Sequence, residues 1–178
     1  MRMRILVLGV VAACSNAADP ATRDAPPPVG SDAPPPPVDM PGDDDAPPGV
    51  VHVLVVNEVA PGESPDWFEV VNATFEPVQM ADFVFVDVAG DFAKAVAFPA
   101  RMLGPGERFA QDVDGTVVPF KLASDEEIWV YRAADHALSD GIDWDDGVAP
   151  AGSSYARMPD TFGAFATTAT QTKGAPNQ

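Results

Sequence analysis

Short apolar runs separated by turn sequences fill the chain after residue 50. In residues 66–72 the side chains alternate, so that Phe68 and Val70 fall on one face of a strand and Trp67 and Glu69 on the other. This two-residue period predicts a half-buried β-strand. The same criteria predict strands at residues 50–56, 66–72, 83–87, 93–98, 108–113, 127–132 and 137–144.

Turn sequences punctuate these segments. Glycine and proline pairs such as Pro61-Gly62 break regular structure, and the other predicted turns are Gly104-Pro105-Gly106, Asp114-Gly115 and Asp140-Gly141. No window of eleven or more residues has a convincing apolar stripe with the helical period. The pattern therefore predicts an all-β domain, residues 50–178, folded as a two-sheet antiparallel sandwich.

The first residues have a different pattern. Arg2 and Arg4 precede an apolar run at residues 5–13. As a helix this run would be only about 13 Å long, against about 30 Å of bilayer hydrocarbon. It suits the apolar region of a secretory signal rather than a transmembrane helix.

The sequence Val-Ala-Ala-Cys at residues 11–14 resembles a bacterial lipobox. The resemblance implies a lipoprotein signal peptide at residues 1–13 and a lipid anchor on Cys14, the only cysteine of the chain. Several acyl chains would anchor the protein firmly to a membrane. By analogy, Ser15 favours the outer membrane of a Gram-negative cell envelope. An ordinary secretion signal followed by a free thiol remains the alternative.

Residues 14–49 differ again in composition. Asp-Ala-Pro-Pro occurs at residues 24–27, 32–35 and 45–48. Proline removes backbone donors and disfavours both helix and sheet. We expect a disordered, extended linker whose residues 19–49 span at most about 95 Å. A ligand for a proline-binding groove is the alternative interpretation.

Composition narrows the functional classes. The 178 residues include 27 acidic and 10 basic side chains, a formal net charge of −17. Such a charge repels phosphate backbones, so we expect no nucleic-acid partner. A single cysteine excludes both an intramolecular disulfide framework and a thiolate zinc cluster.

Several polar residues interrupt the apolar strands. Asn57, Glu58, Glu69 and Asn72 either form a polar pocket or cation site, or satisfy backbone groups at loops and strand ends. We favour the structural interpretation. Arg157 and Asp160 are close enough in sequence to predict a bidentate ion pair that fixes the final strand.

One acidic segment is a candidate for calcium. Asp140, Asp143, Asp145 and Asp146 supply the hard oxygen ligands that Ca²⁺ prefers. Their spacing does not match a helix-loop-helix calcium site, because Gly147 replaces an expected acid and no glutamate follows at the twelfth position. The expectation is therefore no cofactor, with Ca²⁺ as the alternative.

Catalytic motifs are not recognisable. The chain has no Gly-x-Ser-x-Gly elbow, and Ser153 and Ser154 have no recognisable base nearby in sequence. We expect His52 and His136 to be incidental surface or strand-edge residues rather than ligands. A pair of catalytic carboxylates for glycoside hydrolysis remains an alternative, because many pairs are possible among 27 acidic residues. We expect no enzyme, with a hydrolase as the weaker alternative.

An ordered series of short motifs resembles the lamin tail domain of bacterial secreted proteins. The series begins with residues 57–60, 66–72 and 80–87, and it continues at residues 98–99, 103–107, 120–122, 128–130, 142–144, 153–160 and 172–177. The resemblance implies an immunoglobulin-like sandwich without an intersheet disulfide. Thr161 stands where the family has glycine. The residues matched to the family's motifs include Asn57, Glu58, Asp66, Trp67, Glu69, Asn72, Asp87, Arg157 and Asp160.

These observations favour a non-catalytic cell-envelope lipoprotein whose sandwich serves binding or structural interaction. Calcium-dependent adhesion and polysaccharide binding are the alternatives. The partner, a protein or a polysaccharide, stays open, because a fold does not fix a function. Exposed aromatic side chains commonly bind ligands, which makes Trp67, Trp129 and Trp144 candidates for contact.

Overall fold

The computed structural model describes residues 50–178. The predicted signal peptide, the Cys14 anchor and the linker lie outside these residues. Within the described part of the chain, no helix is long and apolar enough to cross a membrane.

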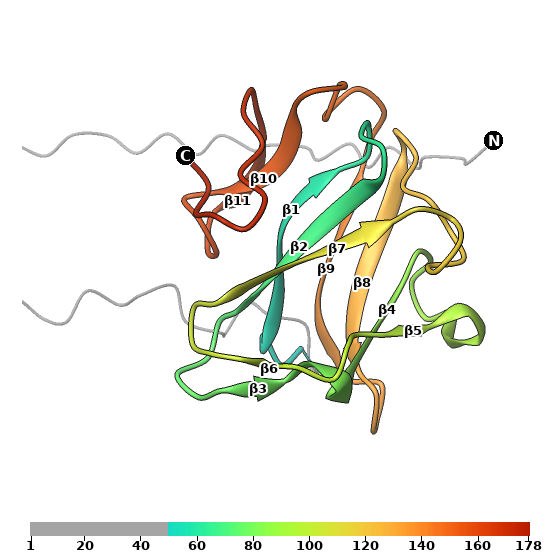
Figure 1. Ribbon diagram of the computed structural model, residues 1–178, viewed down its shortest axis with the longest axis vertical. Coiled ribbons are helices and arrows are strands. Elements are labelled where there is room, and N and C mark those ends of the chain that lie inside the picture. The colour runs from blue at the N-terminus through green and yellow to red at the C-terminus, as the bar shows by residue number, and fades with distance from the viewer. Residues whose placement is uncertain (1–49) are drawn as a thin grey trace, which may run out of the picture. The chain divides into compact units, whose positions relative to one another are not determined.

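Two antiparallel sheets form a β-sandwich (Figure 1). Sheet 1 has the order β11-β10-β1-β2-β7, with β1 Leu54–Ala60, β2 Asp66–Asn72, β7 Arg108–Val113, β10 Ser154–Met158 and β11 Ala164–Thr168. Sheet 2 has the order β5-β4-β8-β9, with β4 Phe83–Val86, β5 Val96–Ala97, β8 Glu126–Arg132 and β9 Leu138–Trp144. A two-stranded ribbon pairs β3 (Val78–Gln79) with β6 (Met102–Leu103). Two 3-10 helices complete the elements, Met80–Asp82 and Phe92–Lys94.

Aromatic side chains occupy the centre of the core between the sheets. Phe68 of β2 and Phe85 of β4 have ring centroids 5.0 Å apart in an edge-to-face arrangement. The ring centroid of Phe98 lies 6.1 Å from that of Phe68 and 4.8 Å from that of Phe85. These geometries match the preferred arrangements of aromatic quadrupoles. Apolar side chains of both sheets complete the core, so the predicted all-β sandwich is confirmed.

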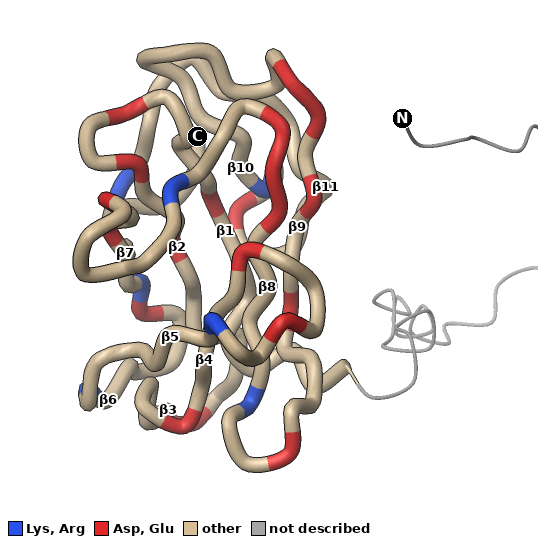
Figure 2. The backbone as a smooth tube through the Cα atoms, turned by 90° about the vertical axis from the view of Figure 1, so that its right-hand side faces the viewer, with Lys and Arg blue, Asp and Glu red and all other residues tan. Residues whose placement is uncertain are grey.

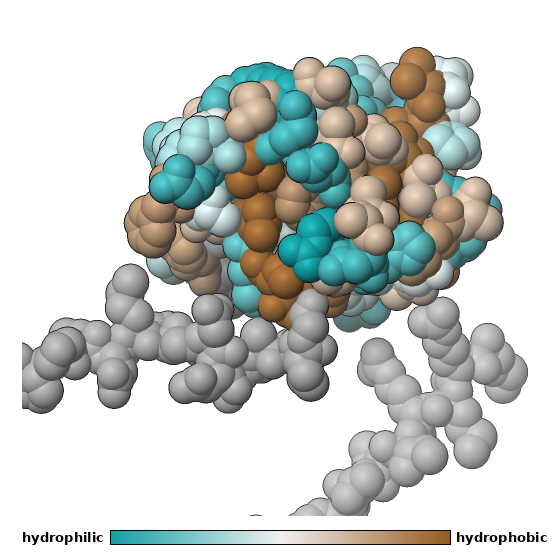
Figure 3. Space-filling view, turned by 90° about the horizontal axis from the view of Figure 1, so that it is seen from below, coloured by the Kyte–Doolittle hydropathy of each residue, from teal (hydrophilic) through white to brown (hydrophobic). Residues whose placement is uncertain are grey.

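One end of the sandwich carries the β3–β6 ribbon. Viewed from that end, hydrophobic side chains lie between hydrophilic ones on the surface (Figure 3). Met102 of β6 is 53% exposed. Isolated exposed apolar side chains of this kind are common on folded proteins and need no partner.

The strand boundaries differ from the prediction at the start of the domain. β1 begins at Leu54 rather than residue 50 and runs to Ala60. The residues before it are joined to β9 instead, because Val51 donates its N–H to the Leu138 carbonyl. Asn57 and Glu58 lie inside β1 although they are polar, because Glu69 and the Thr172 N–H bind their side chains.

Two other predictions were wrong. The segment 93–98 forms the Phe92–Lys94 3-10 helix and the short strand β5 instead of one long strand. The predicted turn at Asp140 and Gly141 lies inside β9. Gly141 faces Trp129 across the β8–β9 pair, and a Cβ there would lie 2.2 Å from the indole ring. The glycine therefore makes room for a tryptophan and does not form a turn.

The hairpin of β10 and β11 completes sheet 1. Its turn contains Thr161, whose φ of 70° lies in the left-handed region that favours glycine. Thr161 donates its N–H to the side-chain oxygen of Asn57, at 2.9 Å. This bond holds a β-branched residue in a conformation that it rarely adopts.

Side chains of β9 join the two sheets at one edge. β10 pairs with β1 only near Glu58 and Val59, which leaves the first half of β1 without a strand partner on that side. Ser139 Oγ accepts the Leu54 N–H at 2.9 Å and donates to the Leu54 carbonyl. Asp140 accepts the Val56 N–H at 2.8 Å. Polar side chains thus satisfy backbone groups that a neighbouring strand would otherwise bind.

Candidate functional site: a polar cluster under the C-terminal segment

A β-bulge in β1 places polar side chains on the outer face of sheet 1, the face turned away from sheet 2. Val56 pairs with Val70 and Glu58 pairs with Glu69, so Asn57 is the extra residue between them. A bulge changes which side chains face the core. Val56 and Val59 both join the core, and Glu58 faces Glu69 on the other side.

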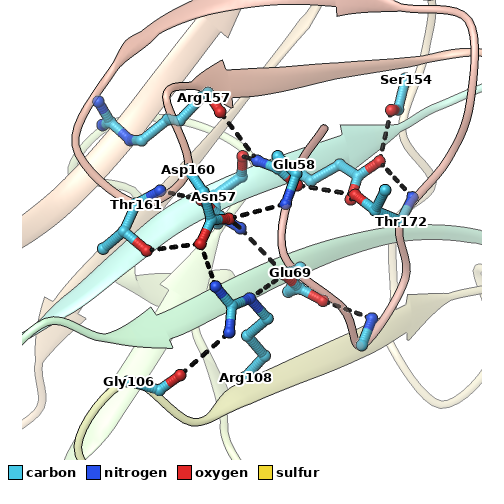
Figure 4. A network of polar contacts seen from close by, with 12 residues as sticks. Asn57, Glu58, Glu69, Gly106, Arg108, Ser154, Arg157, Asp160, Thr161 and Thr172 are labelled. Carbon is cyan, nitrogen blue, oxygen red and sulfur yellow. Dashed lines mark hydrogen bonds and ion pairs between the residues drawn. The ribbon is translucent and has the colours of Figure 1, made fainter.

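The C-terminal segment, residues 170–178, binds to this outer face (Figure 4). Three of its backbone N–H groups donate to three carboxylates of the cluster. The pairs are Thr172 to Glu58 at 3.0 Å, Gly174 to Glu69 at 2.6 Å and Asn177 to Asp160 at 3.0 Å. Charge-assisted bonds of this kind are stronger than neutral ones. The carboxylates therefore hold a chain end that lacks strand partners.

Asn57 connects the carboxylates with one another. Its amide nitrogen donates to Glu69 and to Asp160, at 3.1 Å each, while its oxygen accepts the Thr161 N–H. Asn177 donates in turn to the backbone carbonyl of Asn57 at 3.1 Å. The asparagine thereby uses both ends of its amide inside the cluster.

Arg108 of β7 supplies positive charge to the cluster. It forms an ion pair with Asp160, and its Nε lies 3.7 Å from Glu69 Oε1. Burial alone would raise the pKa of Asp160. Hydrogen bonds from Asn177 and Asn57 and the charge of Arg108 outweigh burial, so the pKa of Asp160 lies below its usual range.

Glu69 is in the opposite situation. Its side chain is fully buried, and burial raises its pKa from 4.5 to about 6. The hydrogen bonds from Asn57 and Gly174 and the charge of Arg108 lower the pKa, but by less than burial raises it. The carboxyl group therefore takes up a proton in the folded protein at a higher pH than in the unfolded chain.

We expect Glu69→Gln to remove part of the pH dependence of stability. Between pH 4.5 and 6 the folded state binds more protons at Glu69 than the unfolded state does, so stability falls as pH rises through this window. The change amounts to about 2 kcal/mol for a shift of this size. Urea unfolding of wild type and variant between pH 4 and 7 measures the difference.

The control for this prediction is Glu107→Gln. Glu107 is exposed, and its pKa is lowered by a hydrogen bond from Gly104 and by Arg101, so its titration lies below the window. This control should keep the wild-type fall in stability. Parallel pH curves for wild type and Glu69→Gln would contradict the assignment.

Arg157 does not pair with Asp160, so the predicted ion pair is wrong. Arg157 binds Asp140 of β9 at 2.9 Å and donates to the Val56 carbonyl at 2.8 Å. Its guanidinium lies over the Phe165 ring, 4.6 Å from the centroid. Arg157 thus points between the sheets, while the turn that follows β10 directs Asp160 to Arg108 on the outer face.

Asp140 is a buried structural residue. It accepts bonds from Arg157 and from the Val56 N–H. Burial raises its pKa, against the lowering effect of Arg157. Asp143, Asp145 and Asp146 are not buried with it. Residues 50–178 contain no group of three or more acidic, histidine or cysteine side chains placed to hold a metal ion, so the four calcium candidates do not form one site.

The remaining residues matched to the lamin tail motifs occupy separate places. Asn72 ends β2, donates to the Leu103 carbonyl at 2.9 Å and accepts the Thr74 N–H at 2.9 Å. Asp66, at the start of β2, has a pKa raised by burial. Asp87 follows β4, and its Oδ1 is buried without a hydrogen-bond partner.

Acidic residues recur along the loops at the end opposite β3 and β6 (Figure 2). A shallow pocket of about 290 Å³ lies between these loops, lined by Glu63, Ser64, Pro65, Asp66, Val113, Asp114 and Lys121. Lys121 places one positive charge among three acids there.

The three tryptophans differ in exposure. Trp67 and Trp144 are each only 2% exposed, so neither is free to bind a ligand. Trp144 donates its indole N–H to the Ala123 carbonyl at 3.1 Å. Trp129 is partly exposed on the outer face of sheet 2, against Gly141. Of the three candidates, Trp129 alone is available for contact.

Sequence reasoning missed the partners that complete the cluster. Arg108 carried no functional assignment, and Thr172 and Asn177 were matched only to the last of the lamin tail motifs, up to 120 residues from the groups they bind. Polar residues at 57–58 and 69 inside apolar strands were the one available signal. Comparison with known proteins adds no further assignment, since no family model, curated protein or solved structure matches the chain.

Proposed function

We propose that the chain is a lipid-anchored cell-envelope protein whose lamin-tail-like β-sandwich acts as a non-catalytic binding or structural module. The order of its segments supports this proposal. A basic start, an apolar run, the Val-Ala-Ala-Cys motif and a proline-rich acidic stretch precede a separate folded domain. This order is typical of a protein that is exported, anchored and held away from a membrane.

The polar cluster is the observation that favours a non-catalytic role. Glu58, Glu69 and Asp160 are each bound by backbone N–H groups of the protein's own C-terminal segment. A catalytic acid or base needs its proton-accepting oxygen within reach of a substrate. These carboxylates instead fix a chain end to the sheet, which is a structural task.

The lamin tail resemblance gains support from where its motifs fall. Residues 57–60 lie in β1, residues 66–72 are β2, and residues 128–130 lie in β8. Thr161 has a φ of 70° at the position where the family has glycine. A position at which a family has glycine commonly has a backbone conformation that favours glycine, and residue 161 has such a conformation.

The direction of β1 favours one end of the sandwich for partner binding. β1 starts beside the β3–β6 ribbon and runs to the opposite end, where residues 61–65 connect it to β2 (Figure 1). The linker joins the domain ahead of β1, so this opposite end is the part of the domain farthest from the attachment point. The acidic loops of this end are one surface that a protein or polysaccharide partner could meet. The partly exposed Trp129, in the middle of β8 on the outer face of sheet 2, is a second one.

Replacement of the anchor residue tests the proposal. We expect Cys14→Ser to abolish fatty-acid labelling and to release the protein from the membrane fraction, because no other thiol can accept the lipid. Ser15→Ala serves as the matched control and should keep both labelling and membrane association. A Cys14→Ser protein that still labels and sediments with membranes would refute the anchor.

A further inference from the structure

β11 is the edge strand of sheet 1. It pairs with β10 from Ser154↔Thr168 to Met158↔Ala164, and within residues 50–178 no backbone hydrogen bond joins its other side to another element. Phe165 packs against Tyr155, with ring centroids 5.3 Å apart, which fixes the strand in the sheet. A free, ordered strand edge is a template for a further strand.

The other sheet edges have features that oppose strand addition. β5 has only two residues. β9 is joined to β1 through Ser139 and Asp140. β7 carries Arg108 and Asp112, both in ion pairs. Short length, covering contacts and charge are the usual means by which proteins protect their edges.

β11 has five residues and no charge, and its one bond to the loop before β10 runs from the Thr167 hydroxyl to the Val148 carbonyl, at 2.6 Å. Residues 161–172 contain no charged side chain and no proline, in a chain with a formal net charge of −17. Phe162, in the turn before β11, is 81% exposed. The least charged stretch of the folded domain therefore coincides with its open strand edge.

We propose that β11 pairs antiparallel with β11 of a second copy of this chain, extending sheet 1 across a two-fold axis. An antiparallel strand pair is self-complementary, so identical strands satisfy each other. Repulsion between two acidic copies is smallest where neither carries charge. The proline-rich residues 19–49 are a poor alternative occupant, because proline lacks the N–H that strand pairing needs. The pairing does not depend on the lipid anchor.

A cysteine scan tests the geometry of this contact. In full-length Cys14→Ser protein the only thiol is the one introduced, at Ala164, Ala166, Thr167 or Ala169. We expect disulfide-linked dimers to peak at the position nearest the two-fold axis and to fall away on both sides. Ala97→Cys, on the exposed edge of sheet 2, is the control and should give few dimers. Equal cross-linking at every exposed position, Ala97 included, would overturn the proposal.

Sedimentation equilibrium measures the same contact without a cross-link. The full-length Cys14→Ser chain, which carries no lipid, should show a concentration-dependent monomer–dimer equilibrium. In this background Thr167→Lys should weaken dimerisation at least tenfold, because it places two like charges at the paired edge. Ala97→Lys should leave dimerisation unchanged, and circular dichroism checks that each variant keeps its β-sheet. A full-length chain that stays monomeric at all concentrations would exclude this pairing, and so would a Thr167→Lys variant that dimerises like wild type.

Discussion

Arg157→Ala should lower the free energy of unfolding by about 3–5 kcal/mol, the cost of breaking a buried ion pair. The guanidinium binds Asp140, the Val56 carbonyl and the Gly163 carbonyl, so one side chain links β10 to β9, β1 and the hairpin turn. Its removal leaves Asp140, a buried carboxylate, without its cation. Urea unfolding at pH 7 measures the loss.

Two further arginine variants separate burial from charge. Arg132→Ala breaks the exposed pair with Asp135 and should change the free energy of unfolding very little, because solvent screens that pair. Arg157→Lys keeps the charge beside Asp140 but loses the planar fork that reaches two carbonyls, so its stability should lie between wild type and Arg157→Ala. Equal losses for Arg157→Ala and Arg132→Ala would show that Arg157 does not join the sheets.

Gly163→Ala should also destabilise strongly, by about 3 kcal/mol or more, since overpacking against backbone forces the chain to move. A Cβ at Gly163 would lie 2.0 Å from the carbonyl carbon of Met158. The shift would break the bond from the Gly163 N–H to the Pro159 carbonyl, at 2.7 Å, which closes the turn between β10 and β11. The turn would open, and β11 would pair less firmly with β10.

Gly104→Ala is the matched control for this glycine. A Cβ there meets only Glu107 Oε2 at 3.4 Å, the end of a flexible side chain. Its cost should stay below about 1 kcal/mol. Thermal unfolding compares the two variants, and NMR signals of β11 report whether it pairs less firmly with β10. A Gly163→Ala protein as stable as Gly104→Ala would contradict the close approach.

The sequence predicted the strands whose signal is local. β2 and β7 have the predicted boundaries, because alternation over six or seven residues marks a half-buried strand. The sequence did not predict β11, because its alanine and threonine residues give little alternation in hydrophobicity. The bulge at Asn57 is a register shift in the pairing of β1 with β2, and the sequence of a single strand does not show it.

The polar cluster was only half predictable. Asn57, Glu58 and Glu69 stood out because polar residues inside apolar strands need partners. The partners come from β7 and from the C-terminal segment, more than 100 residues away for Thr172 and Gly174. Nearness in sequence suggested Asp160 as the partner of Arg157, whereas the fold directs the two side chains to opposite faces of sheet 1.

Buried polar side chains hold the C-terminal segment on the outer face of sheet 1. Native-state hydrogen exchange of the Thr161, Thr172, Gly174 and Asn177 amides tests this arrangement, since each amide donates to a side chain of the cluster. We predict that all four exchange slowly, with protection that falls when Asn57 is replaced by Ala. Exchange as fast as that of an unstructured peptide would show that these side chains do not hold the segment.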